Sequence, residues 1–537
     1  MDTTRPNDNK RVRAEPADFE TAISASGFGL FNFILLLAAI PAKSAVIFQT
    51  TTMSYVMPVA ECDLKLTLLD KGVLNAMTYA GMITSAIFWG YLSDTKGRKN
   101  ILVFGYIADA VCVLCSAMSQ TFEMVAVFKF FGGFIVNGPG AVLLTYVTEL
   151  HSNKYRARVV LIIGVITSTA TLALPALSWA IFPQEWHFVI SDNFSIHSWQ
   201  IFLAICCFPS LMSGLLFTIM PESPKFLMSQ GKNAEALLAF QKVYYINTRK
   251  PKSTYPIKSL VEEVPSRDGN INESVYTIEA KANTLTQRKH RNGLKALRDG
   301  LQQMKPMIRK PLLGHSIHVY TMQFCLLLGL NTIRLWLPQL FASIAEYEAL
   351  NLGTNSSSNL CTILEYSVNK TATAVINYPE ACETNAHVSM DMYINNIIVA
   401  VATLVGYCFA GSIVNLLGTK NMLICGLFIS GACGLSLYWS SSGLTTLVIS
   451  SLFIAVCSVS TSTLLSVIVT LFPTTLRTLV VSCAMMFGRL GALSGNMLFP
   501  VFIEIGCISP FLMVGLVLFC AGSLACILPS PKKTIFI

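Results

Sequence analysis

Twelve runs of about twenty mostly apolar residues dominate this sequence. A helix of that length crosses the roughly 30 Å hydrocarbon core of a bilayer, whereas a β-barrel strand needs only about ten residues of alternating polarity. Charged residues make up 12% of the 537 residues, about half the share found in soluble domains. The pattern therefore predicts an all-α polytopic membrane protein and excludes a soluble globular protein and an outer-membrane barrel. The predicted spans are residues 28–52, 73–93, 101–119, 124–147, 158–182, 200–220, 315–341, 392–416, 421–440, 444–470, 479–501 and 507–528.

The distribution of lysine and arginine orients these helices, because basic loops stay in the cytosol. With the N-terminus inside, the cytosolic segments hold 31 of the 38 basic residues, and the outer loops hold Lys65, Lys71 and Lys370. We therefore expect both termini in the cytosol and a retained N-terminal tail, not a signal peptide. The net charge of +9 reflects this asymmetry and favours contact with membrane lipid. It gives no reason to expect a nucleic-acid partner.

Polar segments divide the chain. The predicted units are a cytosolic tail (1–27), a six-helix bundle (28–220), a basic cytosolic loop (221–314), a second six-helix bundle (315–528) and a cytosolic C-terminal tail (529–537). Within the basic loop, helices are expected near Asn233–Ile246 and Asn292–Met307. The outer loop at 342–391 contains glycosylation sequons at Asn355 and Asn369, and another outer loop has one at Asn193.

Thirteen of the sixteen cysteines lie inside apolar runs, where a thiol behaves as a small hydrophobic group. Cys62, Cys361 and Cys382 lie instead in outer loops, on the oxidising side of the membrane. We predict a disulfide between Cys361 and Cys382, which leaves Cys62 unpaired, although Cys62 could compete as a partner.

A repeat relates the two halves of the chain. The segment Gly90-Tyr-Leu-Ser-Asp-Thr-Lys-Gly-Arg-Lys99 returns in degraded form as Gly411-Ser-Ile-Val-Asn-Leu-Leu-Gly-Thr-Lys420. The same offset of 321 residues relates Gly105 to Gly426 without a gap. Each half therefore contains six helices on one plan, as in transporters built from two parallel repeats.

The first copy of this segment resembles the signature loop between helices 2 and 3 of the major facilitator superfamily. Two other segments resemble its sugar-porter-like members: Tyr146-x-x-Glu149 followed by Arg156 at the end of helix 4, and Pro221-Glu222-Ser223-Pro224 after helix 6. The resemblance implies the major facilitator fold, with two pseudo-symmetric six-helix bundles. In that fold helices 1, 4, 7 and 10 line a central cavity and helices 5, 8 and 11 flank it.

Further residues are similar to the branch of synaptic vesicle glycoprotein 2 and its related proteins. They are Phe19-Glu20 and Gly27-Phe28-Gly29 before helix 1, and Gly488-Arg489-Leu490-Gly491 in helix 11. We identify the chain as an insect-type member of that branch. Two departures stand out: the outer loop after helix 7 is far shorter than the luminal domain of the vesicle glycoproteins, and acids that relatives carry in helix 1 are Val46 and Gln49 here.

Charged residues of the signature loops are expected to meet at the cytosolic face. Opposite charges there can bias the inner side of a transporter toward closure, and each exposed pair contributes only about 0.2–1 kcal/mol, so the residues must act together. We predict a gating network of Asp94, Arg98, Lys99, Glu149, Arg156, Glu222 and Arg477.

Four cations and one acid lie within the predicted spans. A charge at the bilayer centre costs about 2.5–3.5 kcal/mol on insertion scales, so each must snorkel, pair or face water. Lys129 and Arg334 lie near outer helix ends, which favours snorkelling to the interface. Lys43 and Arg489 lie deeper and are expected to face the cavity or a neighbouring helix. Asp109 in helix 3 is interpreted as a structural partner of a cation or hydroxyl, with proton coupling as the alternative.

This excess of positive charge favours an anionic or zwitterionic substrate. Polar neutral residues at similar depth are further candidates, although each can instead hydrogen-bond a neighbouring helix. The substrate-binding candidates are Lys43, Gln49, Asn137, Asn331, Arg334 and Arg489.

No pattern of nucleophile, metal ligands or nucleotide loop emerges, so we predict no enzyme activity, no cofactor and no metal site. The main hypothesis is a monomeric secondary transporter of a small organic solute that works by alternating access. The alternative is a transport-inactive protein that keeps the fold and binds cytosolic trafficking partners. Either would reside in the plasma membrane or in an intracellular vesicle membrane.

Overall fold

Long helices account for almost all of the computed structural model, which describes residues 16–184, 186–191, 194–261, 312–350, 359–366, 368, 390–472 and 474–528. Eleven helical spans in these ranges are long and apolar enough to cross a membrane, and α3, with 29 residues, is the twelfth long helix. Large apolar side chains also cover the outside, among them Leu37, Phe104 and Leu516, as lipid contact requires. The all-α prediction is confirmed.

Both halves contain six spans in the predicted order. The first half consists of α2 (Leu30–Ala60), α3 (Leu68–Lys96), α4 (Arg98–Ala117), α5 (Phe122–Glu149), α6 (Asn153–Ile181) and a sixth span broken into α7 (Ser198–Cys206) and α8 (Phe208–Ile219). The second half consists of α13 (Leu312–Leu350), α15 (Met390–Leu417), α16 (Thr419–Ser436), α17 (Gly443–Leu471), α18 (Thr474–Ile505) and α19 (Ile508–Ile527).

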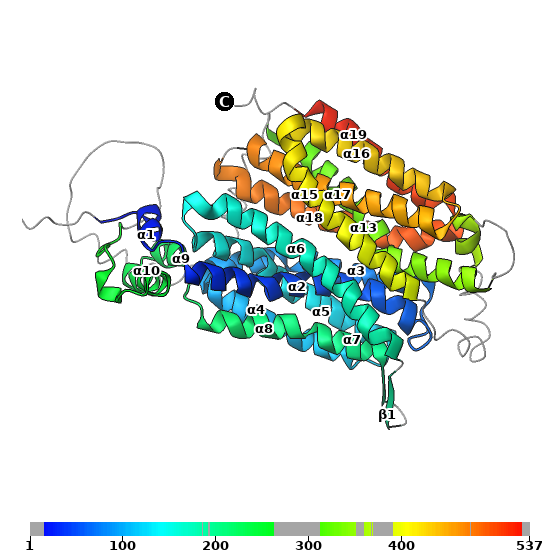
Figure 1. Ribbon diagram of the computed structural model, residues 1–537, viewed down its shortest axis with the longest axis horizontal. Helices are drawn as coiled ribbons and strands as arrows, with labels where there is room; N and C mark the ends of the chain where they lie inside the picture. Colours follow the sequence, from blue (N-terminus) through cyan, green and yellow to red (C-terminus); the bar gives the residue numbers. More distant parts are fainter. Residues whose placement is uncertain are drawn as a thin grey trace, which may run out of the picture.

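The two halves lie side by side, with α3 packed against α18 and α6 against α15 (Figure 1). A short β-hairpin of β1 (His187–Ser191) and β2 (Phe194–His197) marks one end of the molecule. Helices α1 (Phe19–Ala25), α9 (Pro224–Ser229) and α10 (Asn233–Thr248) lie at the opposite end. We call the first the hairpin end. We call α1, α9, α10 and residues 249–261 the cap, and their side of the molecule the cap end.

The cap has its own small core, built from Phe19, Ile23, Phe226, Phe240 and Tyr255. The segment before α1 pairs with the end of the cap through the Ala17–Leu260 bridge. The helix expected near Asn233–Ile246 is present as α10, whereas the one expected near Asn292–Met307 lies outside the described residues. Part of the segment predicted as a cytosolic tail therefore belongs to the cap.

The repeat is visible in the packing as well as in the sequence. Gly97 and Gly418 each precede the third helix of their half and each has a positive φ, 91° and 76°, which favours glycine. Gly105 packs against Pro139, and Gly426 packs against Ser460 in the other half. All three pairs of positions, 97 and 418, 105 and 426, 139 and 460, differ by the same offset of 321.

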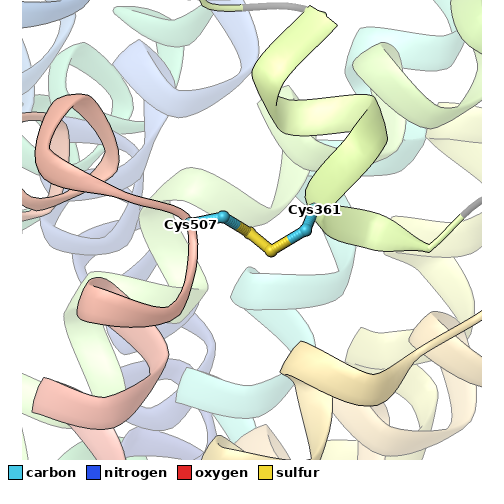
Figure 2. Close-up of a disulfide and its surroundings, with 2 residues drawn as sticks. All are labelled: Cys361 and Cys507. Atoms are coloured by element: carbon cyan, nitrogen blue, oxygen red, sulfur yellow. A yellow bond between two sulfur atoms is a disulfide. The ribbon is translucent and has the colours of Figure 1, made fainter.

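The predicted Cys361–Cys382 disulfide is wrong, because Cys361 bonds Cys507 in the turn between α18 and α19 (Figure 2). The sequence placed Cys507 at the first position of an apolar run, which concealed that it lies at the helix end. Cys62 is also disulfide-bonded, so the expectation that it is unpaired is wrong too. Cys382 lies outside the described residues, as do the sequon residues Asn193, Asn355 and Asn369.

Candidate functional site

A cavity of about 240 Å³ lies between the halves, near the middle of the spans. Its walls come from α2, α6, α13, α15 and α17, which are spans 1, 5, 7, 8 and 10. Spans 1, 7 and 10 were expected there; span 4 contributes no described lining residue. The lining residues are Ile47, Thr51, Tyr55, Gly164, Thr167, Ser168, Thr171, Arg334, Leu337, Asn396, Val399, Ala400, Thr403, Tyr407, Ile454, Ser458 and Ser462.

Arg334 is the one charged residue among the described residues that line the cavity. Its guanidinium donates to Thr51 Oγ1 at 2.9 Å, which links α13 to α2 across the halves. Its Nε is buried and has no hydrogen-bond partner among the described residues. The expectation that Arg334 snorkels is therefore wrong: α13 runs to Leu350, so residue 334 lies mid-helix instead of near its outer end.

Hydroxyl groups make up most of the remaining polar surface. Thr167, Ser168 and Thr171 form a stripe on α6, and Tyr407 Oη lies 3.3 Å from Ser462 Oγ between α15 and α17. The sequence did not single these residues out, because a Ser or Thr in a helix can satisfy its hydroxyl on the carbonyl four residues earlier. Thr167 does this with Ile163 at 2.8 Å. The signal that was available is the recurrence of hydroxyls at helical spacing in spans 5 and 10.

Two predicted substrate contacts lie inside the first half instead of in the cavity. Asn137 donates to the Met82 carbonyl at 2.9 Å and to Ser85 Oγ at 3.0 Å, so it joins α5 to α3. Gln49 packs against Gly132 of α5, where any side chain would collide with its amide. Both residues stabilise the packing of the half that contains them.

The other candidates lie around the cavity without all entering it. Asn331 accepts a hydrogen bond from Tyr79 Oη at 3.1 Å, a second link between the halves. Tyr79 also lies within electrostatic range of Arg334 and Arg489. Lys43 is half-buried on α2, two turns before Thr51 on the same face of the helix. Arg334 is thus the candidate cation that reaches the cavity wall.

Lys129 does not snorkel either. Its side chain is 1% exposed, and Nζ donates to Thr52 Oγ1 at 2.6 Å inside the first half. Asp109 is fully buried and accepts a hydrogen bond from Ser210 Oγ at 2.6 Å. The structural interpretation of Asp109, as partner of a hydroxyl, agrees with this contact.

The halves contact each other on the hairpin side of the cavity. Tyr55 and Val56 of α2 belong to the same buried cluster as Leu337 and Phe341 of α13. Trp179 Nε1 of α6 also donates to Met390 Sδ of α15 at 3.0 Å. Nearer the cap, the buried apolar cluster that contains Phe31 and Tyr146 draws on the first half and the cap only.

Four of the predicted network residues meet at the cap end of the first half. Glu222 Oε1 accepts hydrogen bonds from the backbone N–H groups of Arg98, Lys99 and Ser223, at 2.9, 3.0 and 2.8 Å. A carboxylate at this place accepts hydrogen bonds from the free N–H groups at the start of α4, and its negative charge is stabilised by the positive end of the helix dipole. The Arg98 guanidinium lies 3.6 Å from Glu149. A side chain at Gly97 would collide with Glu222, which explains why glycine is required there.

The remaining network residues are placed differently. Arg156 pairs with Glu20 of α1 at 2.8 Å, so it fastens the cap to α6 instead of joining Arg98. The backbones of Asp94 and Arg477 belong to α3 and α18, but their side chains lie outside the described residues. Next to Arg156, burial lowers the pKa of His151, so this imidazole is neutral at pH 7.

Two family models match the chain. The model described as "Sugar (and other) transporter" matches residues 30–305, about half of the chain. The model of the Major Facilitator Superfamily matches residues 360–535. Together they cover the six spans of the first half and the second half from residue 360 onward, without α13.

Curated relatives include the synaptic vesicle glycoproteins. The chain is 30% identical to human synaptic vesicle glycoprotein 2B over 232 residues, which is 43% of this chain and 34% of that protein. It is 27% identical to synaptic vesicle glycoprotein 2C of Mus musculus over 246 residues, 45% of this chain and 34% of that protein. The matched region thus spans about a third of these relatives.

Solved structures of a bacterial transporter share the fold. One is titled a partially occluded inward open conformation of the xylose transporter XylE from E. coli, with a TM-score of 0.61 and 16% identity; the match covers 93% of this chain and 100% of that one. Another is titled D-xylose-proton symporter, with a TM-score of 0.62 and 16% identity over 94% of this chain and 99% of that one. At this identity the likeness shows the fold alone.

Proposed function

Because the chain belongs to the sugar (and other) transporter family of the major facilitator superfamily, on the branch of the synaptic vesicle glycoproteins, we propose that it is a secondary active transporter of a small organic solute. The two halves would rock about the central cavity to expose it to each side of the membrane in turn. The observation that carries this proposal is the cavity between the halves with Arg334 in its wall.

An anionic or zwitterionic solute suits this cavity best. No Asp or Glu is among the described residues that line it, so the positive charge of Arg334 is not balanced there. A cation in a site with little water attracts anions and repels cations. The free Nε of Arg334 and the surrounding hydroxyls supply donors for a carboxylate or similar group. At about 240 Å³, the cavity is smaller than the pockets that bind drug-sized ligands.

We propose that the structure corresponds to an inward-facing state. The contacts between the halves through Arg334, Asn331 and Trp179 lie at the cavity or on its hairpin side. The count of basic residues supports a cytosolic cap end and cytosolic termini. The Cys361–Cys507 bridge supports an oxidising environment at the hairpin end, outside the cell or in a vesicle lumen. In this proposal the charge network at the cap end favours closure of the cytosolic side.

A second function is favoured by one observation. The resemblance to the synaptic vesicle glycoproteins implies acids at the positions of Val46 and Gln49, and here both residues are used for packing. Val46 lies 3.1 Å from where a Cβ on Gly140 would be, and Gln49 packs on Gly132. A chain without those acids would be a transport-inactive membrane protein that binds trafficking partners through its cytosolic segments. Folded protein that neither binds nor moves any tested solute would support this alternative.

Uptake into proteoliposomes tests the proposal. Purified protein is offered a panel of radiolabelled organic anions, zwitterions, cations and sugars. We expect uptake of an anion or zwitterion. We expect Arg334→Gln to weaken it roughly tenfold or more, since a hydrogen bond to a charged group contributes about 1.5–3 kcal/mol.

Arg334→Lys, which keeps the charge, should retain part of that uptake. The exposed Arg158→Gln serves as the matched control and should behave as the unmodified protein. Robust uptake of an organic cation, or full activity of Arg334→Gln, would contradict the assignment of the cavity.

A further inference from the structure

Three lysines gather where the cap meets the end of the sixth span. Lys242 of α10 donates through Nζ to the carbonyl of Ile219, the last residue of α8, at 2.7 Å. Lys99 in the first turn of α4 and Lys252 just after α10 lie within electrostatic range of it. Burial lowers the pKa of Lys242, and the positive charges of Lys99 and Lys252 lower it further. Like charges that act on one another in this way are stabilised by an anion in their vicinity.

Among the described side chains, the acids nearest to these lysines have other partners. The ion pairs among the described residues involve none of the three. Glu222 is occupied by three backbone N–H groups, Glu149 by Arg98 and Ser223, and Glu235 by Lys232. Residues 223–261 as a whole contain seven basic residues and one acid. Among the described residues, the cluster is therefore a site of positive charge that no ion pair neutralises.

Two members of the cluster lie at the ends of membrane-spanning helices: Lys99 at the start of α4, and Lys242 through its bond to Ile219 at the end of α8. Gly214 of α8 packs against Val103 and Ile107 of α4, so the two helices run together toward the cap. Ile219, five residues beyond Gly214, and Lys99, four residues before Val103, are thus at a similar level. The Ile219 side chain is 69% exposed at the end of a membrane-spanning helix, where it meets lipid.

We propose that Lys99, Lys242 and Lys252 form a binding site for the phosphate of an anionic phospholipid in the leaflet on the cap side. Inner-leaflet lipids carry the negative charge that basic residues near the membrane bind. The lipid would rest against Ile219 and place its phosphate among the three ammonium groups. It would thereby hold α10 of the cap against the ends of α4 and α8. The inference uses the proposed cytosolic orientation of the cap and does not depend on transport.

Native mass spectrometry of the full-length protein tests this site. Protein released from nanodiscs that contain phosphatidylcholine with either phosphatidylserine or phosphatidylinositol 4,5-bisphosphate is expected to retain the anionic lipid over phosphatidylcholine. Lys99→Gln/Lys252→Gln should reduce that retention roughly tenfold or more, because each basic residue near an anionic membrane strengthens binding about fivefold. Lys99→Arg/Lys252→Arg should restore it. Lys242 is left unchanged because it also caps α8.

Lys232→Gln/Lys258→Gln is the matched control, since it removes two exposed charges from the same cap. Equal lipid retention by the Gln variant and this control would overturn the proposal. A parallel thermal-unfolding series with inorganic phosphate identifies the source of the anion. If phosphate alone stabilises the detergent-solubilised protein as strongly as the lipid does, the site binds a free anion and the lipid assignment is wrong. Because lipid retention is measured without solute, its failure is distinct from a failure of the transport proposal.

Discussion

At the scale of single residues, Glu222 offers the sharpest test of the cap-end network. Glu222→Gln keeps the size of the side chain but removes the charge that faces three backbone N–H groups and the start of α4. We expect the variant to lose about 1–2 kcal/mol of stability, as for the loss of a helix cap. Thermal unfolding in one fixed detergent measures the effect. Glu235→Gln, whose carboxylate pairs only with exposed Lys232, should change little; equal midpoints for both variants would refute the capping role.

Residue roles could be predicted from the sequence only where a motif fixed them. Glu222, Arg98 and Glu149 belong to recognisable loops, and they meet in the structure. Lys129 and Arg334 carry no such motif, and their depth was judged from the ends of the apolar runs. Those ends misplace a side chain when a helix is longer than its apolar stretch, as α13 is. Which face of a helix meets the cavity depends on packing that the apolar pattern does not encode.

At the scale of elements, Lys420 secures the last helix. Its Nζ donates to the carbonyls of Cys526, at 3.1 Å, and Leu528 at the end of α19. A cation at a helix C-terminus contributes about 0.3–1 kcal/mol. We expect Lys420→Met to lower the unfolding midpoint and Lys420→Arg to preserve it. Lys258→Met, which changes an exposed residue of the cap, is the control. A Lys420→Met protein as stable as this control would show that Lys420 does not stabilise the end of α19.

The Cys361–Cys507 bridge is also a property of elements, because it ties the segment after α13 to the turn between α18 and α19. Closing a loop of 146 residues contributes up to about 5 kcal/mol in the chain-entropy model, and less where the unfolded chain stays inserted as helices. We expect Cys507→Ser to lower the unfolding midpoint. Peptide mapping without reductant should recover Cys361 and Cys507 in one linked pair, whereas free thiols at both positions would disprove the bridge.

The helices themselves were predictable because apolar length is a strong signal. The spans appear in the expected order, and α10 appears where its pattern indicated. The disulfide partner was not predictable, since Cys507 lies where the apolar run continues across a tight turn. The break at Cys207 was also missed, because the residues on both sides of it are apolar.

At the scale of the whole molecule, the repeat of 321 residues gives two halves that share one plan, and this much followed from the sequence. Gly97 and Gly418 share a positive φ, and Gly105 and Gly426 pack against the symmetry-related residues Pro139 and Ser460. The state of the molecule did not follow, because it depends on contacts between halves such as Arg334 to Thr51. Sequence patterns within one half carry no information about how far the other half has rotated.

The rocking of the halves is the central claim, and distances between spin labels in nanodiscs test it most directly. Asn100 and Asn421 are exposed, symmetry-related positions at the cap end; Glu123 and Leu444 are the corresponding pair at the hairpin end. Alternating access predicts two distances for each pair, with the cap-end pair long when the hairpin-end pair is short. Asp94→Asn should shift the ratio of the two states roughly two- to fivefold toward the state in which the halves are apart at the cap end. A single unchanged distance for both pairs, in the unmodified protein and in Asp94→Asn, would contradict alternating access.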